Sequence, residues 1–365
     1  MGTVDDNSGP ELAAWDVATR IGREASRFTT PLDARTRHRL EVDFDEATAR
    51  AEELVEVATG LRSTAGRARG LVVDRAGWVE ANVGSLRRLL ALAGRAIAES
   101  DPRGRGALSP AARVATGVEI GLQLTWMSSK VLGQYDLMPF DGDDAAGFVY
   151  YVGPNVVALE RRHGFAPREF RLWIALHEVT HRLQFTGVPW MREYFLGLVE
   201  RGMSLGVPDA HQLLESLRRA AVEFWEGRNP LAEVGLVGLL ASPDQLTTLR
   251  EAQALMSLLE GHGEFVMARA GEGEVAGATR FASVLAARRA SAKGVAKLVQ
   301  QALGLEAKLH QYSAGRQFVE AVETEAGARL FARVWESPEM LPTMEEIGAP
   351  GRWVTRAGGV SAPSS

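Results

Sequence analysis

Residues 173–185 read Trp-Ile-Ala-Leu-His-Glu-Val-Thr-His-Arg-Leu-Gln-Phe, an apolar stretch that contains the motif His-Glu-x-x-His. Four residues make about one turn of an α-helix, so His177 and His181 project from the same face. Two neutral imidazoles placed in this way can bind one zinc ion, and Glu178 between them can polarise a metal-bound water. The stretch predicts an active-site helix that still needs a third ligand and a substrate cleft.

The residues around the motif bear on how it is interpreted, because so short a pattern also occurs by chance in helices. These residues are of types that usually form a protein core: Trp173, Ile174, Leu176, Val179, Thr180 and Leu183. The two histidines are therefore expected to be largely buried. Buried imidazoles need polar partners. A metal ion is the interpretation that we favour, and two core histidines bonded to backbone or carboxylate groups are the alternative.

Composition narrows the class of protein. The chain has 365 residues, a net charge of -5 and no cysteine. Metal ligands must therefore come from His, Asp and Glu, and nucleic acid is not an expected partner. The N-terminus lacks the features of a signal peptide, and no stretch reaches the roughly 18 apolar residues of a membrane span. We expect a cytoplasmic protein without a membrane partner.

Hydrophobic periodicity predicts a mainly α fold with a small sheet. Residues 1–10 and 358–365 are expected to be disordered tails around a single unit, 11–357, with N-terminal helices in 11–135 and the metal-site half in 136–357. One predicted helix begins at Ser109-Pro110 and is ended by Gly133. The best strand, 148–152, is β-branched and aromatic. We expect it to form the cleft edge, where its backbone would pair with an extended peptide.

The third ligand is expected on a later helix, within Leu-Leu-Glu-Gly-His-Gly-Glu-Phe-Val-Met (258–267). Glu260 and Glu264 lie four residues apart on one face, so Glu260 can bind the metal while Glu264 accepts a hydrogen bond from a ligand histidine. His262 is the alternative third ligand, and it points nearly opposite to Glu260. Gly261 and Gly263 would let this helix approach the histidine helix closely. A solvated helix face is the alternative interpretation of the two carboxylates.

The predicted chemistry uses a water molecule activated by zinc, with Glu178 as the general base that takes its proton and delivers it to the leaving group. A donor for the developing oxyanion is also needed. Lys308, Tyr312 and Arg316 recur at four-residue intervals. Tyr312 is the first candidate, with Arg316 and His310 behind it, and a solvated polar face is the alternative.

Several segments together resemble the zincin-like metallopeptidases of type 2, actinobacterial proteins often described as hydrolases associated with a deazaflavin coenzyme. The segments are 131–136, 154–157, 172–185, 188–190, 258–262, 308–312 and 334–343, and the resemblance extends from about Trp15 to Trp353. It implies a zincin-like metallohydrolase core with extra N- and C-terminal helices, and a glutamate ligand on a later helix, as in gluzincins. No glycine-rich phosphate loop supports deazaflavin binding.

Two functions compete at this point. The first is a zinc-dependent hydrolase, most simply a peptidase with one zinc ion and an unidentified peptide or protein substrate. The second is a catalytically inactive zincin scaffold that acts as a binding or regulatory protein. Glu178 favours the first function, because a purely structural metal site needs no general base. The sequence predicts neither the substrate nor the oligomeric state.

Overall fold

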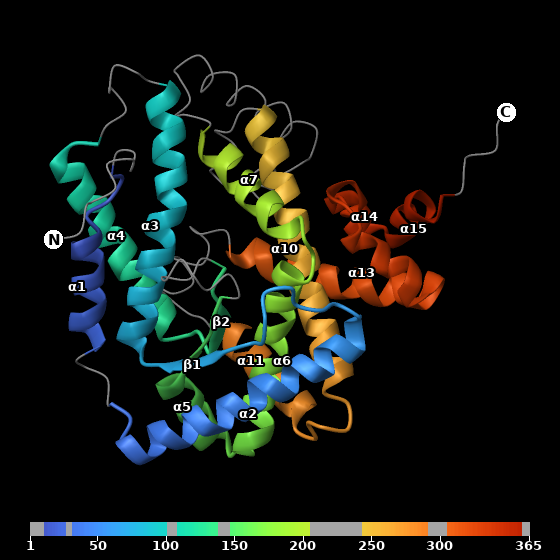
Figure 1. Ribbon diagram of the computed structural model, residues 1–365, viewed down its shortest axis with the longest axis horizontal. Coiled ribbons are helices and arrows are strands. Elements are labelled where there is room, and N and C mark those ends of the chain that lie inside the picture. Colours follow the sequence, from blue (N-terminus) through green and yellow to red (C-terminus); the bar gives the residue numbers. More distant parts are fainter. Residues whose placement is uncertain are drawn as a thin grey trace. The chain divides into compact units, whose positions relative to one another are not determined.

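The computed structural model describes residues 11–26, 31–100, 108–137, 147–204, 243–290 and 305–359. The chain divides into two compact units, Met1–Gly187 with Val266–Phe281, and Val188–Phe265 with Ala282–Ser365. Most described residues are helical and three short strands form one sheet, which confirms the predicted fold class (Figure 1). The expected single unit stays a prediction. The expected tails lie outside the described residues, apart from Gly358 and Gly359.

Three helices of the first unit pack against one another: α1 (Trp15–Ser26), α3 (Arg75–Ser100) and α4 (Pro110–Ser128) (Figure 1). Gly117 and Gly121 allow α4 to approach α1 closely, since a Cβ atom on Gly117 would lie 2.4 Å from the carbonyl oxygen of Ala14. Buried side chains of α1 and α3 form a core cluster with two residues of the sheet, Tyr150 and Val152. The other members of the cluster are Ala13, Trp15, Ala18, Trp78, Val79 and Val83.

Helix α2 (Ala34–Thr59) lies along the active-site helix α6 (Pro167–Thr186). Asp33 caps α2 by accepting a hydrogen bond from the backbone N–H of Thr36, and Gly60 ends it in the left-handed conformation. Its buried side chains are Leu40, Phe44, Ala47, Thr48, Ala51 and Val55. The sequence alone indicates both ends, because aspartate is a preferred N-cap residue and glycine commonly ends a helix.

The sheet has the order β1 (Gly70–Val73), β3 (Val149–Val152), β2 (Gly133–Tyr135). β3 pairs in parallel with β1 and antiparallel with β2. The prediction that strand 148–152 forms the cleft edge is therefore wrong, because both backbone edges of β3 are already paired. All four residues of β3 are buried, so the β-branched and aromatic signal identified the central strand.

The structure also corrects the end of the fourth helix. α4 ends at Ser128, and Gly133 opens strand β2 instead of ending a helix. β2 is three residues long and contains glycine, so it carries no strand signal of its own. β3 leads directly into α5 (Gly153–His163), which precedes α6.

Two buried arginines connect α6 to its neighbours. Arg171 donates to both carboxylate oxygens of Glu160 on α5, at 2.8 Å each, and to Asp43 on α2. Arg182, which has no exposed surface, donates to Glu52 of α2 at 2.6 Å and to the carbonyl oxygen of Gly66 at 2.6 Å. These bonds hold α6 against α2 and α5, and they fix the backbone that carries the motif.

The second unit contains α7 (Met191–Ser204), most of α10 (Pro243–Ala270), α13 (Leu305–Phe331), two 3-10 helices, η1 (Ala332–Trp335) and η2 (Pro338–Met340), and the short helices α14 (Met344–Gly348) and α15 (Pro350–Gly358). α11 (Ala278–Ala290) begins in the first unit and ends in the second. The core of the second unit gathers around Leu258, Phe318, Val322 and Trp353. The sequence also predicts a helix over about 209–225, and short helices and turns over 229–243; both segments lie outside the described residues, apart from Pro243.

Gly261 and Gly315 mark the place where α10 and α13 touch. A Cβ atom on Gly261 would lie 2.2 Å from the carbonyl carbon of Gly315, and one on Gly315 would lie 1.9 Å from the carbonyl oxygen of Ser257. The expectation that Gly261 serves close approach to the histidine helix is therefore wrong. Its missing side chain makes room for α13.

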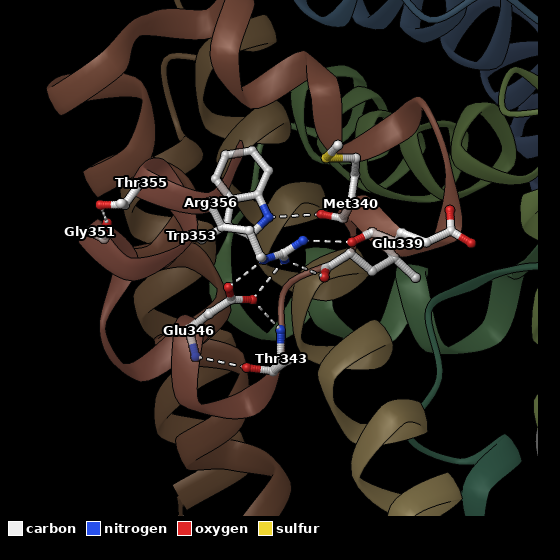
Figure 2. A network of polar contacts seen from close by, with 9 residues as sticks. Glu339, Met340, Thr343, Glu346, Gly351, Trp353, Thr355 and Arg356 are labelled. Carbon is white, nitrogen blue, oxygen red and sulfur yellow. Dashed lines mark hydrogen bonds and ion pairs between the residues drawn. The ribbon is translucent and has the colours of Figure 1, made fainter. Parts of the chain in front are cut away.

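Polar contacts close the C-terminal segment of the second unit (Figure 2). Arg356 donates to both carboxylate oxygens of Glu346 and to the carbonyl oxygens of Glu339 and Leu341. Glu346 and Thr343 form a capping box at the start of α14. One arginine thus joins α15 to the segment before α14.

Candidate metal centre

Helix α6 presents His177 and His181 as a converging pair. Their Nε2 atoms are 3.1 Å apart, and the rings stand edge to face with centroids 4.6 Å apart. Two nitrogen ligands of a tetrahedral zinc ion, each at about 2.0–2.1 Å from the metal, are themselves about 3.3 Å apart. The separation in the structure is close to that value, so the two imidazoles fit one zinc ion.

Gln184 orients the second histidine and was not predicted from the sequence. Its Oε1 atom lies 2.9 Å from Nδ1 of His181, and its side chain is fully buried. An amide oxygen only accepts hydrogen bonds, so Nδ1 carries the proton and the lone pair of His181 is on Nε2. The signal in the sequence was the spacing His-x-x-Gln, which puts the two side chains on one helix face.

Glu178 lies beside the sheet and is 9% exposed. A Cβ atom on Gly133, the first residue of β2, would lie 2.7 Å from Cγ and 2.9 Å from Oε1 of Glu178. Burial raises the pKa of Tyr151, whose hydroxyl is 2.8 Å from that of Thr48, and the negative charge of Glu178 raises it further. The general-base candidate thus lies against the first residue of strand β2, one turn or less from both histidines.

Glu260 is half-buried on α10. His177, His181 and Glu260 each offer one atom that could bind a metal. These three atoms all lie within 4.8 Å of one another. α10 continues without a break to Ala270, and the position of Gly271 that follows it lies next to the side chain of Leu176 on α6. Within the described part of the chain, the two histidines and Glu260 form the group that could hold a metal ion.

His262, the alternative ligand, has a different environment. It is 3% exposed and packs against aromatic rings, with centroid distances of 5.5 Å to Phe331 and 5.0 Å to Trp335. Trp190 in turn donates a hydrogen bond to the carbonyl oxygen of Trp335 at 3.0 Å. His262 is therefore part of an aromatic cluster, and the group of possible ligands does not include it.

The remaining candidates are only partly described. Glu264 is half-buried on α10, and its pairing with a ligand histidine stays a prediction. Tyr312 lies on α13, but its side chain and those of Lys308 and His310 lie outside the described residues. Arg316, one turn further on, forms an ion pair with Glu320 at 2.8 Å.

Comparisons with known proteins identify the family of the chain. The model of the zincin-like metallopeptidase family matches residues 14–354, and the chain belongs to that family, which implies a metal, usually zinc. The chain is also similar to the crystal structure of "a putative hydrolase with a novel fold from Chloroflexus aurantiacus", with 30% identity, a TM-score of 0.70, and coverage of 96% of this chain and 100% of that one. A search of the curated proteins found no match.

Proposed function

We propose that this protein is a zinc-dependent hydrolase and, more specifically, a peptidase. The observation that carries the proposal is the group formed by His177, His181 and Glu260, with Glu178 on the same helix as the two histidines. Family membership and the similarity to a structure described as a hydrolase support the broader class.

The donor set suits zinc, because two imidazole nitrogens and one carboxylate leave a fourth tetrahedral position open. When bound, zinc acidifies water and polarises a carbonyl group. The protein's own contribution is to orient and to move protons. Gln184 keeps the Nε2 lone pair of His181 available, and the Glu178 carboxylate accepts a proton and later delivers it to the leaving group.

Strand β2 is the sheet edge that we propose for binding an extended substrate. The hydrogen bonds from the N–H of Val152 to the carbonyl of Leu132, and from the N–H of Asp136 to the carbonyl of Phe148, connect β2 to β3. In an antiparallel pair these bonds come at alternate residues, so the backbone groups of Gly133 and Tyr135 point away from β3. A peptide that paired with this edge would lie beside Glu178.

We also propose Tyr312 as the donor to the developing oxyanion. Gly261 directly follows Glu260, and it touches α13 at Gly315. Tyr312 precedes Gly315 by three residues, about one helical turn. The backbone of Tyr312 therefore lies about one helical turn from the Gly261–Gly315 contact, which is next to Glu260, the proposed third ligand.

The test compares wild-type protein with Glu178→Gln on a library of peptides, after zinc content has been measured for both. We expect one equivalent of zinc in both proteins and hydrolysis by the wild type alone. Glu178→Gln keeps the shape of the side chain and removes its basicity, so it separates binding from turnover. If zinc is bound and the two proteins are equally inert, the peptidase proposal fails and a binding or regulatory scaffold becomes the better interpretation.

A further inference from the structure

Gly133 stands out among the glycines of the first unit because the atoms nearest to its missing side chain all belong to Glu178. A Cβ atom there would lie 2.7 Å from Cγ, 2.9 Å from Oε1 and 3.0 Å from Cδ. Contacts under 3.0 Å are far inside the sum of van der Waals radii, so one of the two partners has to move.

The strand cannot easily be the partner that moves. Gly133 is opposite Tyr151 in the register of β2 and β3, and its neighbour Leu132 accepts a hydrogen bond of 2.9 Å from Val152. The backbone of Glu178 is equally constrained, because Arg171 and Arg182 hold α6 on both sides of it. What can move is the flexible end of the Glu178 side chain.

We propose that Gly133 is a positioning residue for Glu178: the absence of a side chain at this place on β2 keeps the carboxylate against the sheet. The inference rests on the proposed function, since it is Glu178 that gives the position its importance. A methyl group at residue 133 displaces the carboxylate and leaves the two histidines in place. Misplacing a reacting group by about 1 Å costs on the order of 100-fold in rate.

Gly133→Ala is the test, with Gly77→Ala as the control. A Cβ atom on Gly77 would meet only ordinary contacts, the nearest at 3.4 Å from Asp74. We expect Gly133→Ala to bind one zinc ion like the wild type, to lose on the order of 100-fold in kcat with little change in KM, and to show a displaced Glu178 carboxylate in a crystal structure. An unmoved Glu178 in that structure would overturn the proposal.

A second measurement does not depend on activity. The urea midpoint of unfolding is compared for Gly133→Ala, Glu178→Ala and the double variant. Gly133→Ala should lower the midpoint in the wild-type background and lose this effect when Glu178 is already alanine, and if the single variant does not fold, the double variant should. If Gly133→Ala lowers the urea midpoint equally in both backgrounds, the destabilisation comes from the strand and not from the clash with Glu178. This coupling can be read even if the protein hydrolyses no peptide, so the two proposals can fail separately.

Discussion

Nδ1 of His181 lies 2.9 Å from Oε1 of Gln184, and both side chains belong to α6. Because the amide oxygen can only accept, the contact selects the imidazole tautomer whose Nε2 faces Nε2 of His177. One buried amide therefore fixes the tautomer of a candidate metal ligand.

Replacing Gln184 by leucine should weaken zinc binding by about 10–100-fold, the usual loss when an outer partner of a ligand histidine is removed. Gln184→Glu is the matched control, since it keeps an acceptor oxygen at the same place. Competition with a chelator of known affinity measures the effect. Equal zinc affinity in the leucine variant and the wild type would show that the tautomer is set by another group.

Gly261→Ala should destabilise the protein by at least about 1–3 kcal/mol, the usual cost of overpacking. The added Cβ atom would lie 2.2 Å from the backbone of Gly315, and a backbone cannot rotate away as a side chain can. Gly348→Ala is the control, because nothing lies within 4 Å of that position. Urea unfolding of both variants measures the difference, and equal midpoints would contradict the crossing.

Arg182→Met should cost about 3–5 kcal/mol, the range for removing one partner of a buried ion pair. The variant leaves Glu52 without the guanidinium group and the carbonyl oxygen of Gly66 without its donor. Arg168→Met on the same helix is the control, since Arg168 is 81% exposed and 3.8 Å from Glu46. A surface pair of this kind contributes little. If both variants unfold at the same urea concentration, Arg182 does not hold α6 as we infer.

The parts of the fold that follow from local chemistry were predictable. The Asp33 cap, the Gly60 terminus and the close contact made by Gly117 each depend on residue types with strong local preferences. The candidate histidine pair belongs to the same class, because the spacing of His177 and His181 acts within one helix. Local signals decide these features before any long-range contact forms.

What could not be predicted depends on contacts between elements distant in the sequence. β3 carried the strand signal because it is buried on all sides, and for the same reason it offers no edge to a substrate. The edge strand β2 is too short to show a pattern. Likewise, Gly261 could be identified as a site of close approach, but its partner, Gly315, lies 54 residues later in the chain.

The pairing of Glu346 with Arg356 should make the second unit sensitive to acid (Figure 2). Burial alone would raise the pKa of Glu346, but the hydrogen bonds from Arg356 and from the backbone of Thr343 outweigh it and hold this pKa below its usual value of 4.5. A lowered pKa in the folded state stabilises the fold above that usual value, and this stabilisation is lost as pH falls through the lower pKa.

Arg356→Met should therefore flatten the dependence of stability on pH below about 4.5. The measurement is the urea midpoint as a function of pH for the variant and the wild type. Arg333→Met is a suitable control, since its carboxylate partner, Glu336, is more than half exposed. An unchanged pH dependence in Arg356→Met would mean that Glu346 titrates as it does in the unfolded chain.

The third ligand can be decided by comparing Glu260→Ala with His262→Ala. Glu260 supplies one of the grouped ligand atoms, so its loss leaves two protein ligands and should lower zinc affinity by orders of magnitude. His262 packs against Phe331 and Trp335, so its loss leaves a cavity and should lower stability by about 2–5 kcal/mol. Zinc affinity and urea unfolding are measured on both variants, and His262→Phe, which refills the aromatic cluster without a ring nitrogen, separates packing from ligation. Zinc affinity that collapses in His262→Phe and survives in Glu260→Ala would transfer the third ligand to His262.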